Sequence, residues 1–335
     1  MRKFVFACAL GMALAANQAP ASAASDNVDR AFVEGAIARG AILWDVRDER
    51  AYAKGHIPGA VNVGSAGDVL REPNGEDFLP IPTIERVLGA GVIDPMKEIV
   101  VYATTGNPYA HFAQYTIRFF GGRKVHVYHG GIDDWRAAGK PVSTTPTAPT
   151  PVKLSLKPDT RETVQTADVL KAVGEKGVQI VDARTPGEYS GADIRALRGG
   201  HVPGAVNIPY EQNWKDPETP KKLRNKSVKT VDGMNLKDTA ALKALYAKLD
   251  PEKETIVYCQ SGVRASQTAA VMRDIGFKNV KVYDSSWLGY GNTFSAPVEN
   301  ATYFNVGKLN GQLTKMQARI EQLEKELADA RKAKQ

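Results

Sequence analysis

The feature that most constrains this chain is an internal repeat, because one set of motifs occurs twice in the same order. In the first copy an Asp-x-Arg motif at Asp45 precedes the sequence Gly-His-Ile-Pro-Gly-Ala-Val-Asn, which begins at Gly55. In the second copy the corresponding motifs begin at Asp182 and Gly200. Such a repeat indicates a duplicated folding unit. We therefore expect two similar domains, and 335 residues with 43% hydrophobic composition are enough for two ordinary cores.

Each copy alternates segments of helical and of strand composition. Helical stretches near 28–38 and 167–174 begin the two copies. Strands are expected at 41–45, after Pro58, at 99–102 and at 124–128, and in the second copy at 178–182, after Pro203, at 256–258 and at 280–283. This alternation is typical of an α/β fold in which helices flank a parallel sheet. The sequence thus predicts an N-terminal domain over 24–142 and a C-terminal domain over 161–300.

The segment 143–160 is predicted to be a linker, because it begins with Ser-Thr-Thr-Pro-Thr-Ala-Pro-Thr-Pro. Its prolines favour a stiff, extended spacer between the two domains.

The N-terminus has the pattern of an export signal. Arg2 and Lys3 precede an apolar run, and Ala21-Ser22-Ala23 matches the small residues before a cleavage point. We expect a signal peptide over 1–23 and a periplasmic or secreted protein, with no membrane segment after cleavage. A retained membrane anchor is the less favoured alternative.

Cleavage removes Cys8 and leaves Cys259 as the sole cysteine, so no intramolecular disulfide can form. In an oxidising compartment a lone thiol indicates a reactive group. Cys259 lies between a strand ending at Tyr258 and a helical segment over 265–275. The backbone N–H groups of 260–264 and the helix N-terminus would favour the thiolate, with Gly262 allowing the bend and Arg264 closing the loop. The alternative is a buried cysteine without a chemical role.

The repeat supplies an internal control, since features that both copies share point to the fold and features of one copy point to chemistry. Aligning Tyr102 on Tyr258 places Ala103 opposite Cys259, so the first copy has the turn without the nucleophile. His56 and His201 occur in both copies, which favours a role in the fold. The five histidines show no metal-ligand spacing, and we expect neither a metal nor a cofactor.

Charged segments distinguish the second copy. Its Asp-to-His spacing is eight residues longer, and the extra residues within 190–199 include Arg195 and Arg198, which are candidate anion ligands or part of a solvated loop. The lysine-rich loop 211–232 is expected to be a solvated face. The net charge of +7, or +5 without Arg2 and Lys3, suits small anions. Because the charges are scattered, we do not expect nucleic acid as a partner.

Together, the paired Asp-x-Arg and Gly-His-x-Pro-Gly-Ala motifs, the loop Cys259-Gln-Ser-Gly-Val-Arg and the sequence Val282-Tyr-Asp-Ser-Ser-Trp resemble tandem-domain rhodanese sulfurtransferases of the thiosulfate or 3-mercaptopyruvate type. The likeness covers about 28–292. It implies two rhodanese-like domains, an inactive N-terminal one and a catalytic C-terminal one.

The resemblance implies that Cys259 is the catalytic nucleophile, takes a sulfur from a small anionic donor and passes it as a persulfide to cyanide or a thiol. Loop residues Gln260, Ser261, Gly262, Val263 and Arg264 would hold the persulfide, and Arg184 would bind the donor anion. The neutral Gln260-Ser261 pair departs from the basic loop common in thiosulfate enzymes, and Arg264 departs from the threonine common in mercaptopyruvate enzymes. The loop therefore leans away from thiosulfate without naming the donor.

A phosphatase is the nearest rival enzyme, since relatives of this fold hydrolyse phosphoesters with five residues between cysteine and arginine. Only four residues separate Cys259 from Arg264, which favours sulfur over phosphate. A non-catalytic sulfur carrier or scaffold is the other alternative.

The tail over 303–335 supports association. Its apolar residues follow a heptad pattern at Val306, Leu309, Leu313, Met316, Ile320, Leu323, Leu327 and Ala330. In a parallel pair, Arg319 would face Glu324 and Glu326 would face Arg331. We expect a coiled coil that makes a homo-oligomer through 306–330; the alternative is a helix folded back on the catalytic body.

Overall fold

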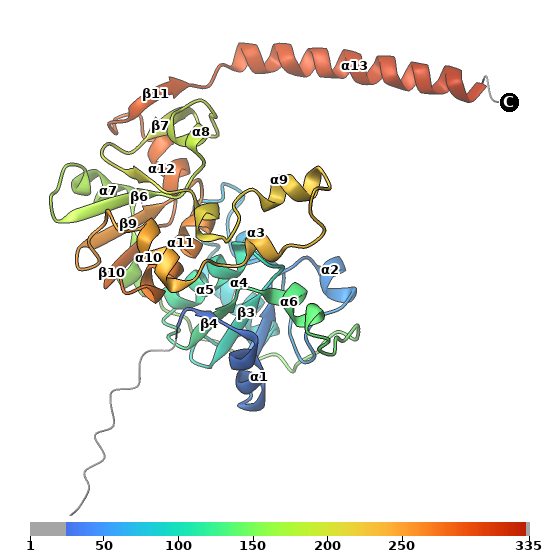
Figure 1. Cartoon of the computed structure of the whole chain (residues 1–335), viewed down its shortest axis with the longest axis vertical. Helices are drawn as coiled ribbons and strands as arrows, with labels where there is room; N and C mark the ends of the chain where they lie inside the picture. The colour runs from blue at the N-terminus through green and yellow to red at the C-terminus, as the bar shows by residue number, and fades with distance from the viewer. Residues whose placement is uncertain (1–24, 333–335) are drawn as a thin grey trace, which may run out of the picture.

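The computed structural model describes residues 25–332, so the expected signal peptide lies outside the described residues. Two α/β units lie against each other, and one long helix leaves the second unit (Figure 1). The α/β class and the two parallel sheets flanked by helices, expected from the repeat, are confirmed.

The first unit is a four-stranded parallel sheet in the order β1-β4-β3-β2, with Trp44 bridging to Val61 beyond β2. Its elements are β1 (Asn27–Val28), α1 (Arg30–Ala38), β2 (Ile42–Asp45), α2 (Glu49–Ala53), α3 (Ala66–Val69), α4 (Ile81–Ala90), β3 (Ile99–Tyr102), α5 (Tyr109–Phe119), β4 (Val125–Tyr128) and α6 (Gly131–Ala137). β3 and β4 are buried along their whole length, in keeping with an apolar composition that His126 of β4 interrupts.

The second unit repeats this plan as a five-stranded parallel sheet in the order β5-β10-β9-β6-β8. Its elements are a 3₁₀ turn at Thr160–Glu162, β5 (Thr163–Val164), α7 (Thr166–Ala172), β6 (Val178–Asp182), α8 (Pro186–Tyr189), β7 (Arg198–His201), β8 (Val206–Asn207), 3₁₀ turns at Tyr210–Asn213 and Asp232–Met234, α9 (Thr219–Arg224), α10 (Thr239–Leu245), β9 (Glu254–Tyr258), α11 (Val263–Asp274), β10 (Asn279–Tyr283), α12 (Ser286–Asn292) and β11 (Glu299–Tyr303).

The repeated motifs form the same contacts in both units. Arg47 pairs with Asp45 and donates to the Gly55 carbonyl, while Arg184 pairs with Asp182 and donates to the Gly200 carbonyl. The repeated histidines likewise stack on a tyrosine, His56 on Tyr52 and His201 on Tyr189, and each ring Nδ1 bonds that tyrosine's carbonyl. These shared residues therefore hold the fold together.

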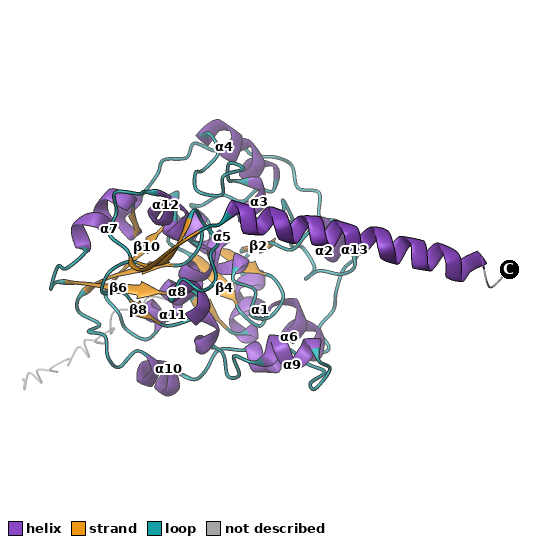
Figure 2. Ribbon diagram, turned by 90° about the horizontal axis from the view of Figure 1, so that it is seen from above, coloured by secondary structure: helices purple, strands orange, loops and turns teal. Residues whose placement is uncertain are grey.

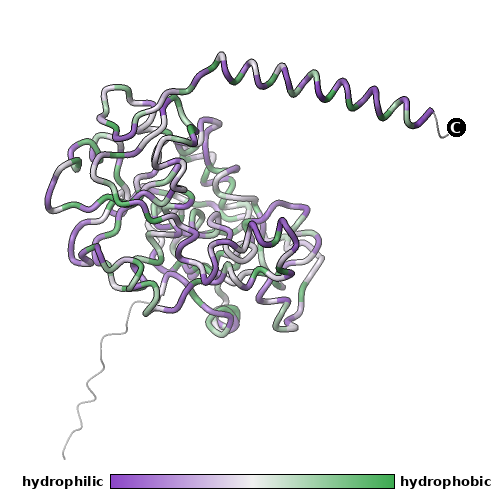
Figure 3. Tube along the Cα trace, turned by 45° about the horizontal axis from the view of Figure 1, so that its top comes forward, coloured by the Kyte–Doolittle hydropathy of each residue, from purple (hydrophilic) through white to green (hydrophobic). Residues whose placement is uncertain are grey.

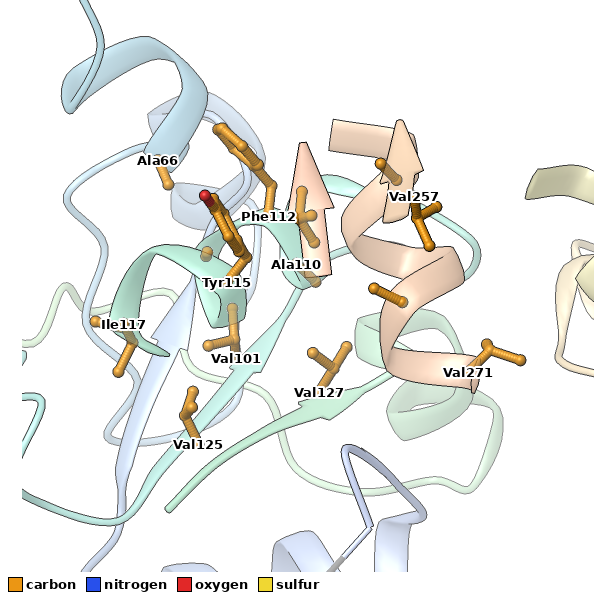
Figure 4. Packing of buried hydrophobic residues seen from close by; sticks show 14 of the residues in the cluster. Ala66, Val101, Ala110, Phe112, Tyr115, Ile117, Val125, Val127, Val257 and Val271 are labelled. Atoms are coloured by element: carbon orange, nitrogen blue, oxygen red, sulfur yellow. The ribbon is translucent and has the colours of Figure 1, made fainter. Parts of the chain in front are cut away.

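Helix α5 of the first unit packs against helix α11 of the second, and the two units share one hydrophobic core. Figure 4 shows Phe112 and Tyr115 of α5 together with Val271 of α11 among the residues of this core. The helix that follows Cys259 is therefore supported by its counterpart from the other copy.

A buried ion pair also crosses between the units. The Arg71 guanidinium makes two hydrogen bonds of 2.9 and 2.7 Å to the Asp284 carboxylate, and both side chains are buried. Asp284 lies in the turn between β10 and α12, next to the cysteine loop. The first unit thus fixes part of the frame around the turn that follows Cys259.

One pairing was not foreseen from the sequence. The end of the extra segment forms β7, which pairs antiparallel with β11 at Glu299–Tyr303. The segment 190–199 is therefore partly a strand instead of a loop, and the ordered second unit continues to Tyr303. Gly199 and Gly200 permit this because a Cβ at either position would meet Thr302 or the Glu299 carbonyl at 2.4 Å.

Helix α13 (Val306–Lys332) projects from the second unit into solvent, and Figure 1 shows it clear of both units. In the view from above, its C-terminal part extends beyond the body of the molecule (Figure 2). All of its described side chains are exposed. Hydrophobic and hydrophilic residues alternate along it (Figure 3). The expected helix is present and does not fold back on the catalytic body. Among residues 25–332, no helix combines the length and apolarity needed to span a membrane.

Candidate active site

Cys259 follows the last residue of β9 and precedes helix α11, as the sequence predicts, and its side chain is 1% exposed. The side chain of Ser286 holds this turn in place through hydrogen bonds. The Ser286 hydroxyl accepts the backbone N–H groups of Cys259 at 3.1 Å and Gly262 at 3.0 Å, and donates to the Tyr283 carbonyl at 2.7 Å. The Gly262 N–H, expected to face the sulfur, is therefore already bound to Ser286.

The N–H groups of Gln260, Ser261, Val263 and Arg264 have no protein acceptor within the described part of the chain. They lie at the start of α11, where unsatisfied donors favour an anion. Gly262 has φ of +81°, and a Cβ there would lie 2.8 Å from the Asp284 carbonyl. Glycine is therefore required both by the left-handed backbone and by the close approach of Asp284.

Glu188 gathers the two arginines nearest the turn. Arg264 donates to both Glu188 oxygens at 2.7 and 2.8 Å, and Arg195 donates to one of them at 3.2 Å. Burial opposes ionisation of Glu188, but the hydrogen bonds and charge of Arg264 outweigh it and lower the pKa of Glu188 to about 2. The same partnership raises the pKa of Arg264 against its burial.

A cavity of about 690 Å³ lies in front of the turn, between the two units. The first unit contributes Thr104, Thr105, Asn107, Pro108 and Tyr109, which belong to the turn that corresponds to the cysteine loop. The second unit contributes Gln260, Ser261, Val263 and Arg264, together with Glu188, Arg195, Tyr210 and Glu211 among others. The turn without a cysteine thus forms one wall of the candidate active site.

The structure brings together Cys259, residues 260–264 and Arg195, but it places two predicted anion ligands elsewhere. Arg184 is 1% exposed, with its guanidinium bound to Asp182 and the Gly200 carbonyl and stacked 4.3 Å from the centre of the Trp287 ring. Arg198 is buried and donates to the carbonyls of Tyr290, Gly291 and Thr293. Neither arginine lines the cavity. These contacts give both arginines a role in the fold, and their expected role as anion ligands stays a prediction.

Sequence reasoning missed Glu188, Glu211 and Ser286. Glu188 carried one local signal, since Thr185 and Glu188 form a capping box at the start of α8, but its pairing with Arg264 spans 76 residues. Ser286 lies beside the noted Trp287, and its positive φ of 51° is not encoded by a glycine. Within residues 25–332, no cluster of three or more histidines, cysteines or carboxylates could hold a metal.

The family model described as "Rhodanese-like domain" matches the chain twice, at residues 29–138 and 165–293. A relative named "Thiosulfate sulfurtransferase", from Corynebacterium glutamicum, is 34% identical over 266 residues, which cover 75% of this chain and 82% of the relative.

Solved structures of EanB share the fold. A form with a cysteine persulfide and ergothioneine has a TM-score of 0.69 and 20% identity, covering 82% of this chain and 70% of that chain. The wild-type EanB structure has a TM-score of 0.68 and 21% identity, covering 82% and 69% of the two chains.

Proposed function

We propose a donor and a route for the sulfur from one premise: the chain belongs to the rhodanese family and is a sulfurtransferase. The donor is thiosulfate, and the sulfur passes through a persulfide on Cys259 to cyanide or a thiol. The observation that carries the proposal is Cys259 in the turn between β9 and α11. The next residues of this turn, Gln260, Ser261, Val263 and Arg264, line a cavity, and within the described residues their backbone N–H groups have no protein acceptor. The neutral residues Gln260 and Ser261 lean away from thiosulfate, but the Corynebacterium relative is named as a thiosulfate sulfurtransferase, and this name supports thiosulfate as the donor.

In the first step the Cys259 thiolate attacks the outer sulfur of thiosulfate. A bond forms between the two sulfur atoms, the bond to the central sulfur breaks, and sulfite leaves with the electron pair. The backbone N–H groups of Gln260, Ser261, Val263 and Arg264 support the negative charge of the persulfide. Arg195, whose side chain is 51% exposed, donates a hydrogen bond to Glu188 and can contact the incoming anion.

The test is the intact mass of the purified protein after incubation with thiosulfate and, separately, with 3-mercaptopyruvate. We expect a gain of one sulfur atom with thiosulfate, which is lost on adding cyanide as thiocyanate appears. Cys259→Ala should show neither the gain nor the thiocyanate. A gain that persists in Cys259→Ala, or no gain with either donor, would exclude this route.

The same proposal includes export and self-association. The N-terminal pattern at residues 1–23 supports a periplasmic or secreted protein, and the mass of protein isolated from its native cells reports whether these residues have been removed. The apolar stripe of α13 supports a homo-oligomer, since it is exposed along the helix. The helix of a second copy of this chain would pack against this stripe.

A further inference from the structure

The turn that presents Cys259 is attached to the start of helix α12. Besides the hydrogen bonds of the Ser286 hydroxyl, two backbone contacts join these segments. Trp287 donates its backbone N–H to the Cys259 carbonyl, and Leu288 donates its own to the Gln260 carbonyl, each at 3.0 Å. The cysteine turn therefore moves together with the first turn of α12.

Asp284 lies just before α12 and also touches the cysteine turn directly. A Cβ at Gly262 would lie 2.8 Å from the Asp284 carbonyl oxygen and 3.3 Å from its Oδ1. A ring carbon of Phe112, from α5 of the first unit, would lie 3.3 Å from the same Cβ position. Asp284 and Phe112 thus enclose Gly262, so a displacement of either one leaves room for the turn to shift.

Arg71 of the first unit contacts both of these residues. Its guanidinium makes two hydrogen bonds to the Asp284 carboxylate, and the side chains of this pair are buried. The Arg71 Cζ also lies 3.6 Å from the centre of the Phe78 ring and 4.8 Å from that of the Phe112 ring. A buried charge is costly to leave without its partner, so the ion pair resists displacement of either side chain.

The repeat shows that this ion pair belongs to the copy that carries the cysteine. Strands β4 and β10 end at Tyr128 and Tyr283, and the next residue is His129 in the first copy and Asp284 in the second. Both of these residues reach the other unit. The His129 ring forms one hydrogen bond to the Met234 carbonyl, whereas Asp284 takes two charge-assisted hydrogen bonds. The stronger contact therefore supports the turn that contains Cys259.

We propose that Arg71 is a positioning residue for sulfur transfer, which acts through Asp284 and Phe112 on the turn that presents Cys259. The proposal rests on the Cys259 persulfide proposed above and adds a residue of the first unit to the groups that support its formation. Arg71 does not line the cavity in front of the turn. Its contribution is geometric, because it fixes the direction of the free backbone N–H groups that follow Cys259.

The first variant, Arg71→Lys, changes the geometry of the pair and keeps its charge. Lysine cannot form two parallel hydrogen bonds to one carboxylate. We expect the single-turnover rate of persulfide formation at saturating thiosulfate, followed by intact mass, to fall about tenfold, because a small misplacement of the turn slows the reaction. The half-saturating thiosulfate concentration should stay within about twofold, since no group that lines the cavity has changed.

Arg118→Lys is the matched control. Arg118 of α5 makes two hydrogen bonds of 2.7 Å to Glu162 of the second unit, so it also joins the units through a bidentate pair. Neither residue lines the cavity in front of the turn. Urea unfolding measures the stability that each lysine variant loses, and the rates are compared where both are folded. We expect Arg118→Lys to keep the wild-type rate within about twofold, although it also weakens a contact between the units.

A double variant separates positioning from stability. Arg71→Met leaves Asp284 as an unpaired buried charge, and adding Asp284→Asn removes that charge. We expect the double variant to be more stable than Arg71→Met but to keep a low rate, because its neutral side chains do not reproduce the paired hydrogen bonds.

A wild-type rate in Arg71→Lys or in the stable double variant would overturn the positioning role, and so would an equal loss of rate in Arg118→Lys. These outcomes leave the sulfurtransferase proposal intact as long as the wild type gains sulfur from thiosulfate. If the wild type gained none, the proposed function itself would fail.

Discussion

Glu188 is the residue on which the electrostatics of the site converge. Its carboxylate is buried and takes three hydrogen bonds from Arg264 and Arg195. Its single negative charge offsets one of the two guanidinium charges beside it. With Asp193 and Glu211 also lining the cavity, the carboxylates outnumber the guanidinium groups there by one.

The low pKa of Glu188 predicts a pH dependence of stability. Its folded pKa is about 2 and its ordinary value is 4.5, so its ionised form stabilises the fold above pH 4.5. That contribution is lost as the pH falls from 4.5 towards 2, and it amounts to roughly 3 kcal/mol at most. Because glutamine cannot ionise, Glu188→Gln lacks this stabilising contribution.

Urea unfolding at several pH values checks this prediction. We expect Glu188→Gln to be less stable than the wild type at pH 7, and the difference in the free energy of unfolding to shrink between pH 4.5 and 2. Exposed Glu252→Gln is the control. A difference that stayed constant over this range would contradict the pairing of Glu188 with Arg264.

At the scale of the element, the cysteine turn depends on Gly262. This residue has φ of +81° and lies against the Asp284 carbonyl, which Arg71 of the other unit holds in place. Gly40 has a similar φ of +80° but no atom near its missing Cβ. The two positions therefore separate backbone strain from steric contact.

We predict that Gly40→Ala costs about 1 kcal/mol of unfolding free energy, from the left-handed backbone alone. Gly262→Ala should cost about 1–2 kcal/mol more. It should also slow sulfur transfer on the order of tenfold or more, because the turn must shift away from Asp284. Thermal unfolding and thiocyanate formation measure the two effects. If Gly262→Ala lost no more stability than Gly40→Ala and kept full activity, the result would argue against a tightly held turn.

Local patterns explain which parts of the fold and site could be predicted. The repeat revealed both sheets, because the same motifs occur in the same order in both copies. It also distinguished Cys259 from Ala103, because the two residues occupy aligned positions. Both copies also share the Asp-x-Arg pair, which favours a role of this pair in the fold. The contacts of Arg184 with Asp182 and the Gly200 carbonyl support that role. The pairing of β7 with β11 and of Glu188 with Arg264 could not be predicted, since each joins distant segments without a local pattern.

At the scale of the whole molecule, the exposed feature is helix α13, whose apolar side chains pack against neither of the two units. Leu313, Ile320 and Leu327 are each about half exposed. An apolar stripe of this length, flanked by charges that complement each other in a parallel pair, fits a second copy of the chain. The two catalytic bodies would then lie at one end of a common rod.

Light scattering after gel filtration tests this assembly. We expect the full chain to have at least twice the mass of one chain, and a chain ending at Asn305, which keeps β11, to be a monomer. Ile320→Glu, on the stripe, should also give monomers. Ala318→Glu, on the opposite face of the helix, should not. A monomeric full chain, or an oligomer that survives removal of the tail, would contradict the proposal.

The shared cavity gives the alanine at position 103 a meaning of its own. Thr104, Thr105, Asn107, Pro108 and Tyr109 line the same cavity as Gln260, Ser261, Val263 and Arg264, so a cysteine at position 103 would begin a turn on the opposite wall of that cavity. A persulfide opposite a second thiol can be discharged by it, leaving a disulfide and losing the sulfur as sulfide. If Cys259 carries the proposed persulfide, the alanine at position 103 means that the facing turn has no thiol that could release this sulfur.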